Sequence, residues 1–213
     1  MALDTPGAKA ARRWIEAAAP EHPSLIDQAH VVDELFGIVN VPMGVWIDED
    51  GVLVRPAEPA FPGRAASESL GADIDLAQLP PVLAETLTEA RKIRIEPDKY
   101  VAALRDWVAH GPASCFALSP EAVVARSRPR GREEAEAAAC FELGQHLSRQ
   151  GLADAAVPWF RQAHRLQPEN WTYKRQAWSM IDRTQGRTAE YDSSWLDDVR
   201  AIGAENYYEP LDM

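Results

Sequence analysis

The chain has 213 residues, of which 46% are hydrophobic and 26% charged, as is usual for a water-soluble globular protein of one or two domains. Its formal net charge of −11 argues against non-specific binding to nucleic acid or to an anionic membrane surface. Because no apolar run approaches the length of a membrane span and no signal-peptide pattern is present at the N-terminus, the expected location is the cytoplasm.

The first elements predicted from the sequence are short. Residues 2–5 form a β-like run, and the Ala- and Arg-rich residues 8–19 predict a helix with an apolar stripe that includes Trp14. Residues 22–27 are expected to be extended, and residues 31–36 predict a short amphipathic helix that a glycine ends.

The following stretch, FGIVNVPMGVWIDEDGVLVR, predicts a β-hairpin around which the rest of the chain is organised. Strands at 43–47 and 52–55 flank an acidic turn that Gly51 closes, which is a strong hairpin pattern. A proline directly before a buried strand is unusual, since proline removes a donor from the strand ladder. The arrangement is consistent if Pro42 is the first strand residue and its bond to Val41 is cis.

This stretch resembles the second half of a thioredoxin-like domain of the redoxin or TlpA type. The resemblance lies in the order of its parts: Asn-Val-Pro, a strand, Ile-Asp-Glu-Asp-Gly and a second strand. The resemblance covers about the first 56 residues. In that family the cis-proline loop lies against the active-site CxxC and binds the substrate backbone. The resemblance therefore implies an α/β fold in which Val41 and Pro42 bind substrate.

The family's first central strand and CxxC helix would have to precede Met1. Three explanations remain open: the protein starts upstream of Met1, which we favour; another segment or chain supplies the strand; or residues 2–5 do not join the sheet. Cys115 and Cys140 are too far apart for a CxxC or a zinc site. They are interpreted as structural thiols, with a redox pair as the alternative, and no catalytic residue, metal site or cofactor is expected.

Residues 140–168 are similar to a tetratricopeptide (TPR) repeat. The repeat pattern W-x₂-L-G-x₂-Y, A-x₃-F, P is matched at Leu143-Gly144, Ala156, Phe160 and Pro168, with Cys in place of Trp and Leu in place of Tyr. Gly144 and Ala156 are small where two helices should touch, and Phe160 should fill the gap between them. One repeat cannot bury its own face, so flanking helices are expected to stack on it.

The predicted fold class is α/β plus all-α. A partial thioredoxin-like unit occupies residues 1–110, with an insertion at about 57–97 that begins as a loop at 57–71, and a TPR-like helical region occupies residues 111–213. The helix predicted at 97–110 is either the last helix of the first unit or the first helix of the second.

Two functions follow from this reading. The first is binding of a protein or peptide without thiol chemistry, through the TPR-like region and the proline loop. The alternative is an active thiol–disulfide oxidoreductase whose catalytic cysteines lie upstream of Met1, which an in-frame C-x-x-C there would favour. No nucleic-acid or membrane partner is expected, and a second copy covering the exposed sheet edge is one route to a homodimer.

Overall fold

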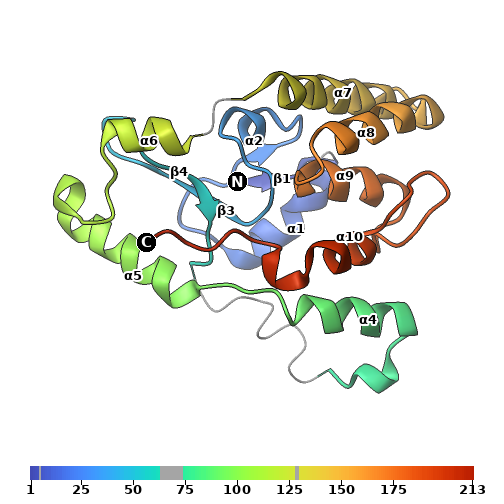
Figure 1. Ribbon diagram of the computed structural model, residues 1–213, viewed down its shortest axis with the longest axis horizontal. Helices are drawn as coiled ribbons and strands as arrows, with labels where there is room; N and C mark the ends of the chain where they lie inside the picture. Colours follow the sequence, from blue (N-terminus) through green and yellow to red (C-terminus); the bar gives the residue numbers. More distant parts are fainter. Residues whose placement is uncertain (5, 63–73, 128–129) are drawn as a thin grey trace. The chain divides into compact units, whose positions relative to one another are not determined.

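The computed structural model describes residues 1–4, 6–62, 74–127 and 130–213. Most of the loop predicted at 57–71 therefore lies outside the described residues. The described residues combine helices with short strands, which confirms a mixed α/β and helical protein at this coarse level (Figure 1).

Contacts divide the chain into two compact units, and both are discontinuous in sequence. Unit 1 consists of Met1–Val39 and Pro129–Tyr191, and unit 2 consists of Asn40–Arg128 and Asp192–Met213. Neither unit ends at residue 110, because long-range contacts rather than chain order hold each unit together. In unit 1, for example, the Trp171 N–H donates to the Val39 carbonyl at 2.7 Å.

Unit 1 joins a short parallel sheet to a helical array. Strand β1 (Ala2–Leu3) pairs with β2 (Ile26–Asp27), with Ala2 opposite Ile26. Among the described residues β1 pairs with neither strand of the hairpin, which forms a sheet of its own. The helices of unit 1 are α1 (Ala8–Ala18), α2 (Val31–Leu35), α7 (Arg132–Arg149), α8 (Ala153–Leu166) and α9 (Trp171–Ile181).

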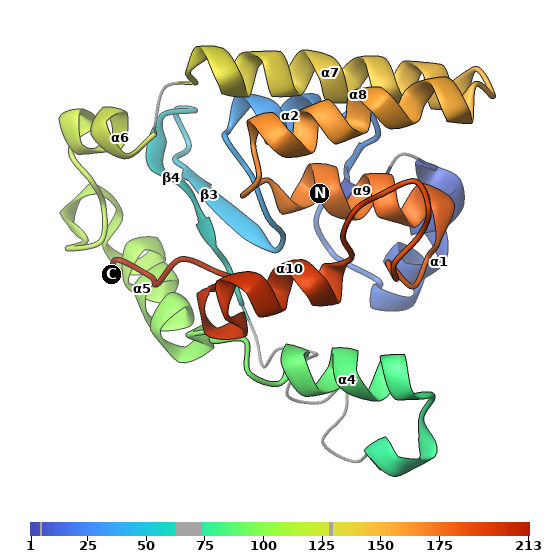
Figure 2. The same ribbon diagram turned by 45° about the vertical axis from the view of Figure 1, so that its right-hand side comes forward.

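Helices α7 and α8 form the helical hairpin that the sequence predicted, and they lie side by side in Figure 2. Gly151, at φ +76°, turns the chain between them. A Cβ added to Gly144 would lie 2.7 Å from Cε1 of Phe160, so the phenyl ring occupies the space that a side chain would take. The predicted contact between a small residue of the first helix and Phe160 is therefore confirmed.

Aromatic rings fill the core of unit 1. Phe141 stacks on Tyr173 at 4.2 Å between centroids and contacts Phe160 at 5.5 Å. Helix α1 contributes little to this core: Ala11 is its buried residue, while Trp14, in the predicted apolar stripe, is 65% exposed. The Arg13 guanidinium lies over the Trp14 ring at 4.5 Å, and such a cation–π contact suits a ring that remains in water.

Unit 2 contains the predicted hairpin. Strand β3 (Met43–Ile47) pairs antiparallel with β4 (Leu53–Pro59), with Trp46 opposite Arg55. Strand β4 extends beyond the predicted end at residue 55, since its backbone stays extended through two prolines. Residues 92–95, for which a brief strand or an extended link was expected, form no strand. The helices of unit 2 are α4 (Pro81–Ala90), α5 (Pro97–His110), α6 (Pro120–Arg126) and α10 (Trp195–Ile202), with 3-10 turns at Leu76–Gln78, Gly111–Ala113 and Ala204–Asn206.

The core of unit 2 forms between the hairpin and α5. Trp46 stacks on Trp107 at 5.0 Å, and its indole N–H donates to the Tyr100 hydroxyl at 3.3 Å. Leu211, near the C-terminus, is 5% exposed and belongs to the same cluster. A Cβ at Gly44 would lie 2.5 Å from the Tyr100 hydroxyl oxygen, so Gly44 lets this helix approach the strand.

Arg55 is a buried charge in unit 2, with 2% of its surface exposed. Its Nε and Nη2 donate to the two carboxylate oxygens of Glu58 at 2.8 and 3.0 Å. Nη1 donates to the Phe116 carbonyl, and Nη2 also donates to the Asp212 carbonyl, both at 2.8 Å. The side chain therefore ties β4 to the segment after α5 and to the end of the chain.

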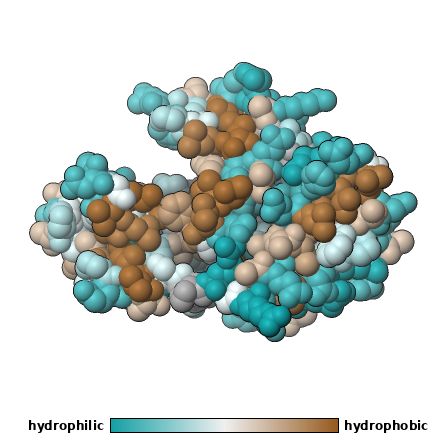
Figure 3. Space-filling model, turned by 90° about the horizontal axis from the view of Figure 1, so that it is seen from above, coloured by the Kyte–Doolittle hydropathy of each residue, from teal (hydrophilic) through white to brown (hydrophobic). Residues whose placement is uncertain are grey.

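Large hydrophobic side chains are also exposed at many positions, and Figure 3 shows them as patches separated by hydrophilic residues. Within the described part of the chain, none of the helices has the length and apolarity that crossing a bilayer requires.

Candidate functional site

Val41 and Pro42, the predicted substrate-binding residues, lie in unit 2 where the chain enters β3. Both are exposed, with 37% of Val41 accessible to solvent. The bond between them is cis, as predicted. We call the segment Asn40–Pro42 the proline loop.

Asn40 fixes the start of the proline loop from inside the protein. It is 4% exposed, and its side-chain oxygen accepts the Val41 N–H at 2.8 Å. Its amide nitrogen donates to the Tyr207 carbonyl at 3.0 Å. The Val41 N–H is therefore already paired within the chain, while the Val41 side chain remains at the surface.

The carbonyls of Val41 and Pro42 are paired as well. The Tyr208 hydroxyl donates to the Val41 carbonyl at 2.7 Å, across 167 positions of sequence. The Ala60 N–H donates to the Pro42 carbonyl at 3.2 Å. Of these two internal donors, the side-chain hydroxyl of the half-buried Tyr208 is easier for a peptide to replace than the backbone amide of the buried Ala60.

A cavity of about 110 Å³ adjoins the loop through Tyr208, which is one of its lining residues. Tyr208 packs edge-on against Phe61, with 5.2 Å between the ring centroids. Glu96 and Arg94 bring charges of both signs to the cavity. Its apolar lining consists of Pro59, Phe61, Ile95, Tyr208, Pro210 and Leu211. Mixed aromatic, proline and charged walls suit a peptide side chain better than a small charged metabolite.

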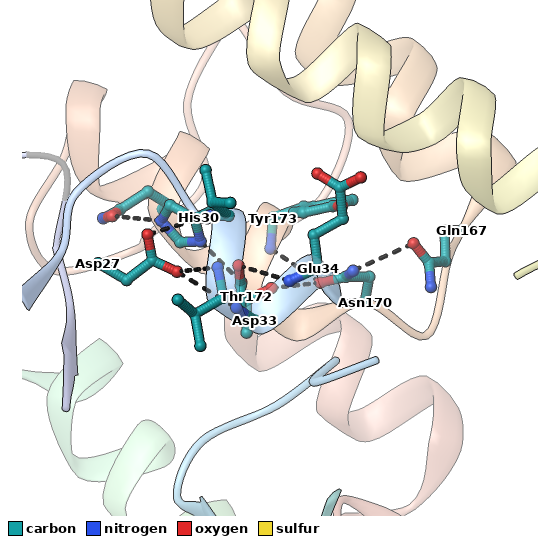
Figure 4. Close-up of polar contacts among 11 residues, drawn as sticks. Asp27, His30, Asp33, Glu34, Gln167, Asn170, Thr172 and Tyr173 are labelled. Carbon is teal, nitrogen blue, oxygen red and sulfur yellow. Dashed lines mark hydrogen bonds and ion pairs between the residues drawn. The ribbon is translucent and has the colours of Figure 1, made fainter. Parts of the chain in front are cut away.

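Unit 1 contains a separate cluster of buried polar groups around α2 (Figure 4). Asp27 begins it: its carboxylate accepts the N–H groups of Val31, Val32 and Asp33 at 3.0, 2.6 and 3.2 Å. A carboxylate at this end of a helix pairs the free N–H groups and interacts favourably with the helix dipole. Asp27 therefore explains why so short a helix is stable here.

His30 and Asp33 form a buried pair, with 3% and 0% of their surfaces exposed. His30 Nδ1 lies 2.8 Å from Asp33 Oδ2, and His30 Nε2 lies 3.2 Å from Gln176 Oε1. Burial lowers the pKa of His30, but the hydrogen bond and charge of Asp33 outweigh it, so the pKa is raised above its ordinary value. Two acceptors facing the two ring nitrogens favour the doubly protonated imidazolium.

The same cluster extends to the start of α9. Asn170 Oδ1 accepts the Tyr173 N–H at 3.1 Å and the Thr172 hydroxyl at 2.6 Å (Figure 4). Burial, together with the charges of Asp33 and Glu34, raises the pKa of Tyr173, so its hydroxyl stays protonated. Because these groups are buried and paired with one another, the cluster holds unit 1 together rather than presenting a reactive group to solvent.

The described residues contain no cluster of His, Cys, Asp and Glu side chains that could hold a metal ion. Cys115 and Cys140 are free thiols, the first exposed and the second buried. Burial and the charge of Glu136 raise the pKa of Cys140, which leaves its thiol protonated and unreactive.

The sequence matches no family model, and neither a curated protein nor a solved structure is significantly similar to it.

Sequence reasoning located the proline loop but missed the residues that hold it. Asparagine side chains often form hydrogen bonds with nearby backbone groups, so Asn40 could have been predicted to bond to the neighbouring Val41. Tyr208 was seen only as part of an aromatic C-terminal stretch, since its contact with Val41 is not visible in local sequence. His30 and Asp33 were missed as a pair because their spacing matches no metal site.

The His30–Asp33 pair makes the stability of unit 1 depend on pH. The folded-state pKa of His30 is raised above its ordinary value of 6.5, so its stabilising contribution is full below about pH 6.5 and is lost as the pH rises through the folded pKa. We therefore expect the free energy of unfolding of unit 1 to fall above pH 6.5. It is measured by urea titration at a series of pH values, with hydrogen exchange of the α7 and α9 amides reporting on unit 1.

The variant His30→Asn should remove this dependence, since asparagine tolerates the left-handed backbone at this position (φ 59°) and does not titrate. His22→Asn, at an exposed histidine, is the matched control and should retain it. If the free energy of unfolding of His30→Asn still falls with pH as in the wild type, another group causes the pH dependence.

Proposed function

We propose that this chain is a non-catalytic binding module, with a partial thioredoxin-like unit and a TPR-like helical region, that captures a protein or peptide partner in the cytoplasm. The observation that carries the proposal is the exposed proline loop beside a cavity with aromatic and proline walls. Thiol chemistry is not part of it, since the two cysteines are a free exposed thiol and a buried one with a raised pKa.

The proline loop is suited to an extended peptide. Val41 and Pro42 offer apolar surface on a rigid support, since Asn40 is buried and bonded on both sides. The Tyr208 hydroxyl is an exchangeable donor at the Val41 carbonyl. A peptide could use its own N–H in that place and direct one side chain into the cavity, which is how main-chain bonds and a pocket together give affinity and specificity.

The helical hairpin α7–α8 offers a second apolar surface for a protein partner. Trp159 is 41% exposed on α8, and Leu152 is 53% exposed just before it. Exposed tryptophan is a common anchor of protein interfaces. The variant Trp159→Ala therefore separates partner capture by the hairpin from peptide capture by the proline loop.

The proposal is tested by affinity selection of a random decapeptide library on the immobilised full chain, followed by fluorescence anisotropy with each enriched peptide. We expect Val41→Asp to weaken binding by about tenfold or more, because a carboxylate replaces apolar contact surface. The matched control is Val52→Asp on the hairpin turn, which is 55% exposed, adds the same charge and should change the affinity by less than about twofold.

Equal effects of Val41→Asp and Val52→Asp would remove the proline loop as the binding site. Loss of binding in Trp159→Ala alone would move the site to the helical hairpin. Failure to enrich any peptide on the wild-type chain and on its variants would overturn the peptide-binding function.

A further inference from the structure

Tyr208, whose hydroxyl donates to the Val41 carbonyl, belongs to the C-terminal segment, residues 207–213. This segment contains neither helix nor strand, and Figures 1 and 2 show it continuing from the α10 region toward α5 as an irregular strap within unit 2. Its last residues are anchored by buried contacts, whereas the part that meets the proline loop is more accessible to solvent.

The last residues of the strap are firmly anchored. Leu211 is buried in the core of unit 2, its N–H donates to a Glu96 carboxylate oxygen at 3.1 Å, and its carbonyl accepts from the Lys99 ammonium. Asp212 pairs with Arg126 at 2.7 Å, and its carbonyl accepts from Arg55 at 2.8 Å. The contacts that hold this end therefore do not depend on Tyr208.

The strap is more accessible where it meets the proline loop. Glu209 and Pro210 are exposed, and Tyr208 is half-buried between Phe61 at 5.2 Å and Tyr207 at 4.9 Å. The Tyr208 hydroxyl reaches the Val41 carbonyl from the end of a rotatable side chain. Rotation of this side chain exposes the carbonyl without releasing the anchor at Leu211.

We propose that Tyr208 is an internal competitor for the Val41 carbonyl, which keeps the proline loop closed until the N–H of an extended peptide replaces the hydroxyl. This regulation rests on the peptide-binding function proposed above. A hydroxyl and a peptide N–H are both donors, so a peptide N–H that takes the position of the Tyr208 hydroxyl forms an equivalent hydrogen bond to the Val41 carbonyl. The affinity for a peptide is therefore reduced by the fraction of molecules in which Tyr208 is bound.

The test uses the full chain carrying Tyr208→Phe, which keeps the ring and its packing but removes the donor. The library selection is run on this variant and on the wild type, and anisotropy is measured with every peptide enriched on either. We expect Tyr208→Phe to bind these peptides about 3- to 10-fold more tightly, the range that one hydrogen bond supports. Tyr208→Ala removes the donor together with an aromatic wall of the cavity, so it should bind these peptides less tightly than Tyr208→Phe does.

Tyr173→Phe, in unit 1, is the matched control and should leave the affinity unchanged. Amide exchange of the β3 and α5 residues reports whether unit 2 of each variant remains folded. One outcome would contradict the role of Tyr208 alone: the wild type and Tyr208→Phe bind the peptides equally well, and Val41→Asp does not bind them. The proposed peptide-binding function would then still be supported. If neither protein enriches a peptide, both proposals fail together.

Discussion

Arg55→Ala should lower the free energy of unfolding of unit 2 by about 3–5 kcal/mol, the usual cost of removing one partner from a buried ion pair. Arg55 is 2% exposed, and it is bonded to Glu58, to the Phe116 carbonyl and to the Asp212 carbonyl. Its removal leaves a largely buried carboxylate and two carbonyls without their donor. The change is measured by native-state amide exchange of β3 and β4 residues.

Arg55→Lys provides a graded comparison and should recover only part of the loss, because lysine keeps the charge but lacks the planar set of donors that reaches three acceptors. Arg105→Ala, at an exposed arginine of α5, is the matched control and should change the free energy by less than about 0.5 kcal/mol. A cost below about 1 kcal/mol for Arg55→Ala would show that water or a neighbouring group replaces the guanidinium.

The contact between Gly144 and Phe160 is expected to produce the second large effect. Phe160 is 2% exposed, so Phe160→Ala should cost unit 1 about 3–5 kcal/mol through the lost burial and the cavity left behind. Gly144→Ala alone should cost about 1–3 kcal/mol, because the new methyl group would lie 2.7 Å from the Phe160 ring.

The two substitutions together give a sharper result than either alone. Once Phe160 is alanine the obstruction is gone, and Gly144→Ala should then stabilise α7 by up to about 1 kcal/mol through its better helix propensity. The effect of one substitution thus changes sign with the other residue, which urea unfolding of the four proteins would measure. Trp159→Ala, one position away and 41% exposed, is the control for loss of an aromatic ring at the surface.

The same sign for Gly144→Ala in both backgrounds would mean that α7 and α8 adjust their spacing freely. The close contact would then not determine the geometry of the helical hairpin.

The local elements were predictable because their causes are local. The acidic turn closed by Gly51 predicted the hairpin, and Pro97 and Gly111 bracket a helix that forms at Pro97–His110. The cis bond before Pro42 was predicted from the position of proline at the start of a strand. The repeat pattern predicted the packing of Gly144 against Phe160, because spacing along two helices fixes which residues face each other.

Other features could not be read from the sequence, and α2 is the clearest case. Its pattern predicts an amphipathic helix, yet Asp33 is buried at 0% exposure while Leu35 is 72% exposed. Apolar periodicity predicts an apolar face toward the core, but here the His30 ring, which lies outside the helix, and the Glu34 N–H supply the partners that make the buried Asp33 carboxylate stable. A partner that lies outside the helix decides which face is buried.

The sequence by itself determined the helices, the hairpin, the contact within the helical pair and the position of the proline loop, since each depends on residues within one element or on two neighbouring helices joined by a short turn. Only the tertiary structure decided which distant groups meet. It joined the end of the chain to β4 through Arg55, and it brought the Tyr208 hydroxyl to the Val41 carbonyl across 167 positions. Such pairings depend on how buried polar groups find partners throughout the fold, and no local pattern encodes that choice.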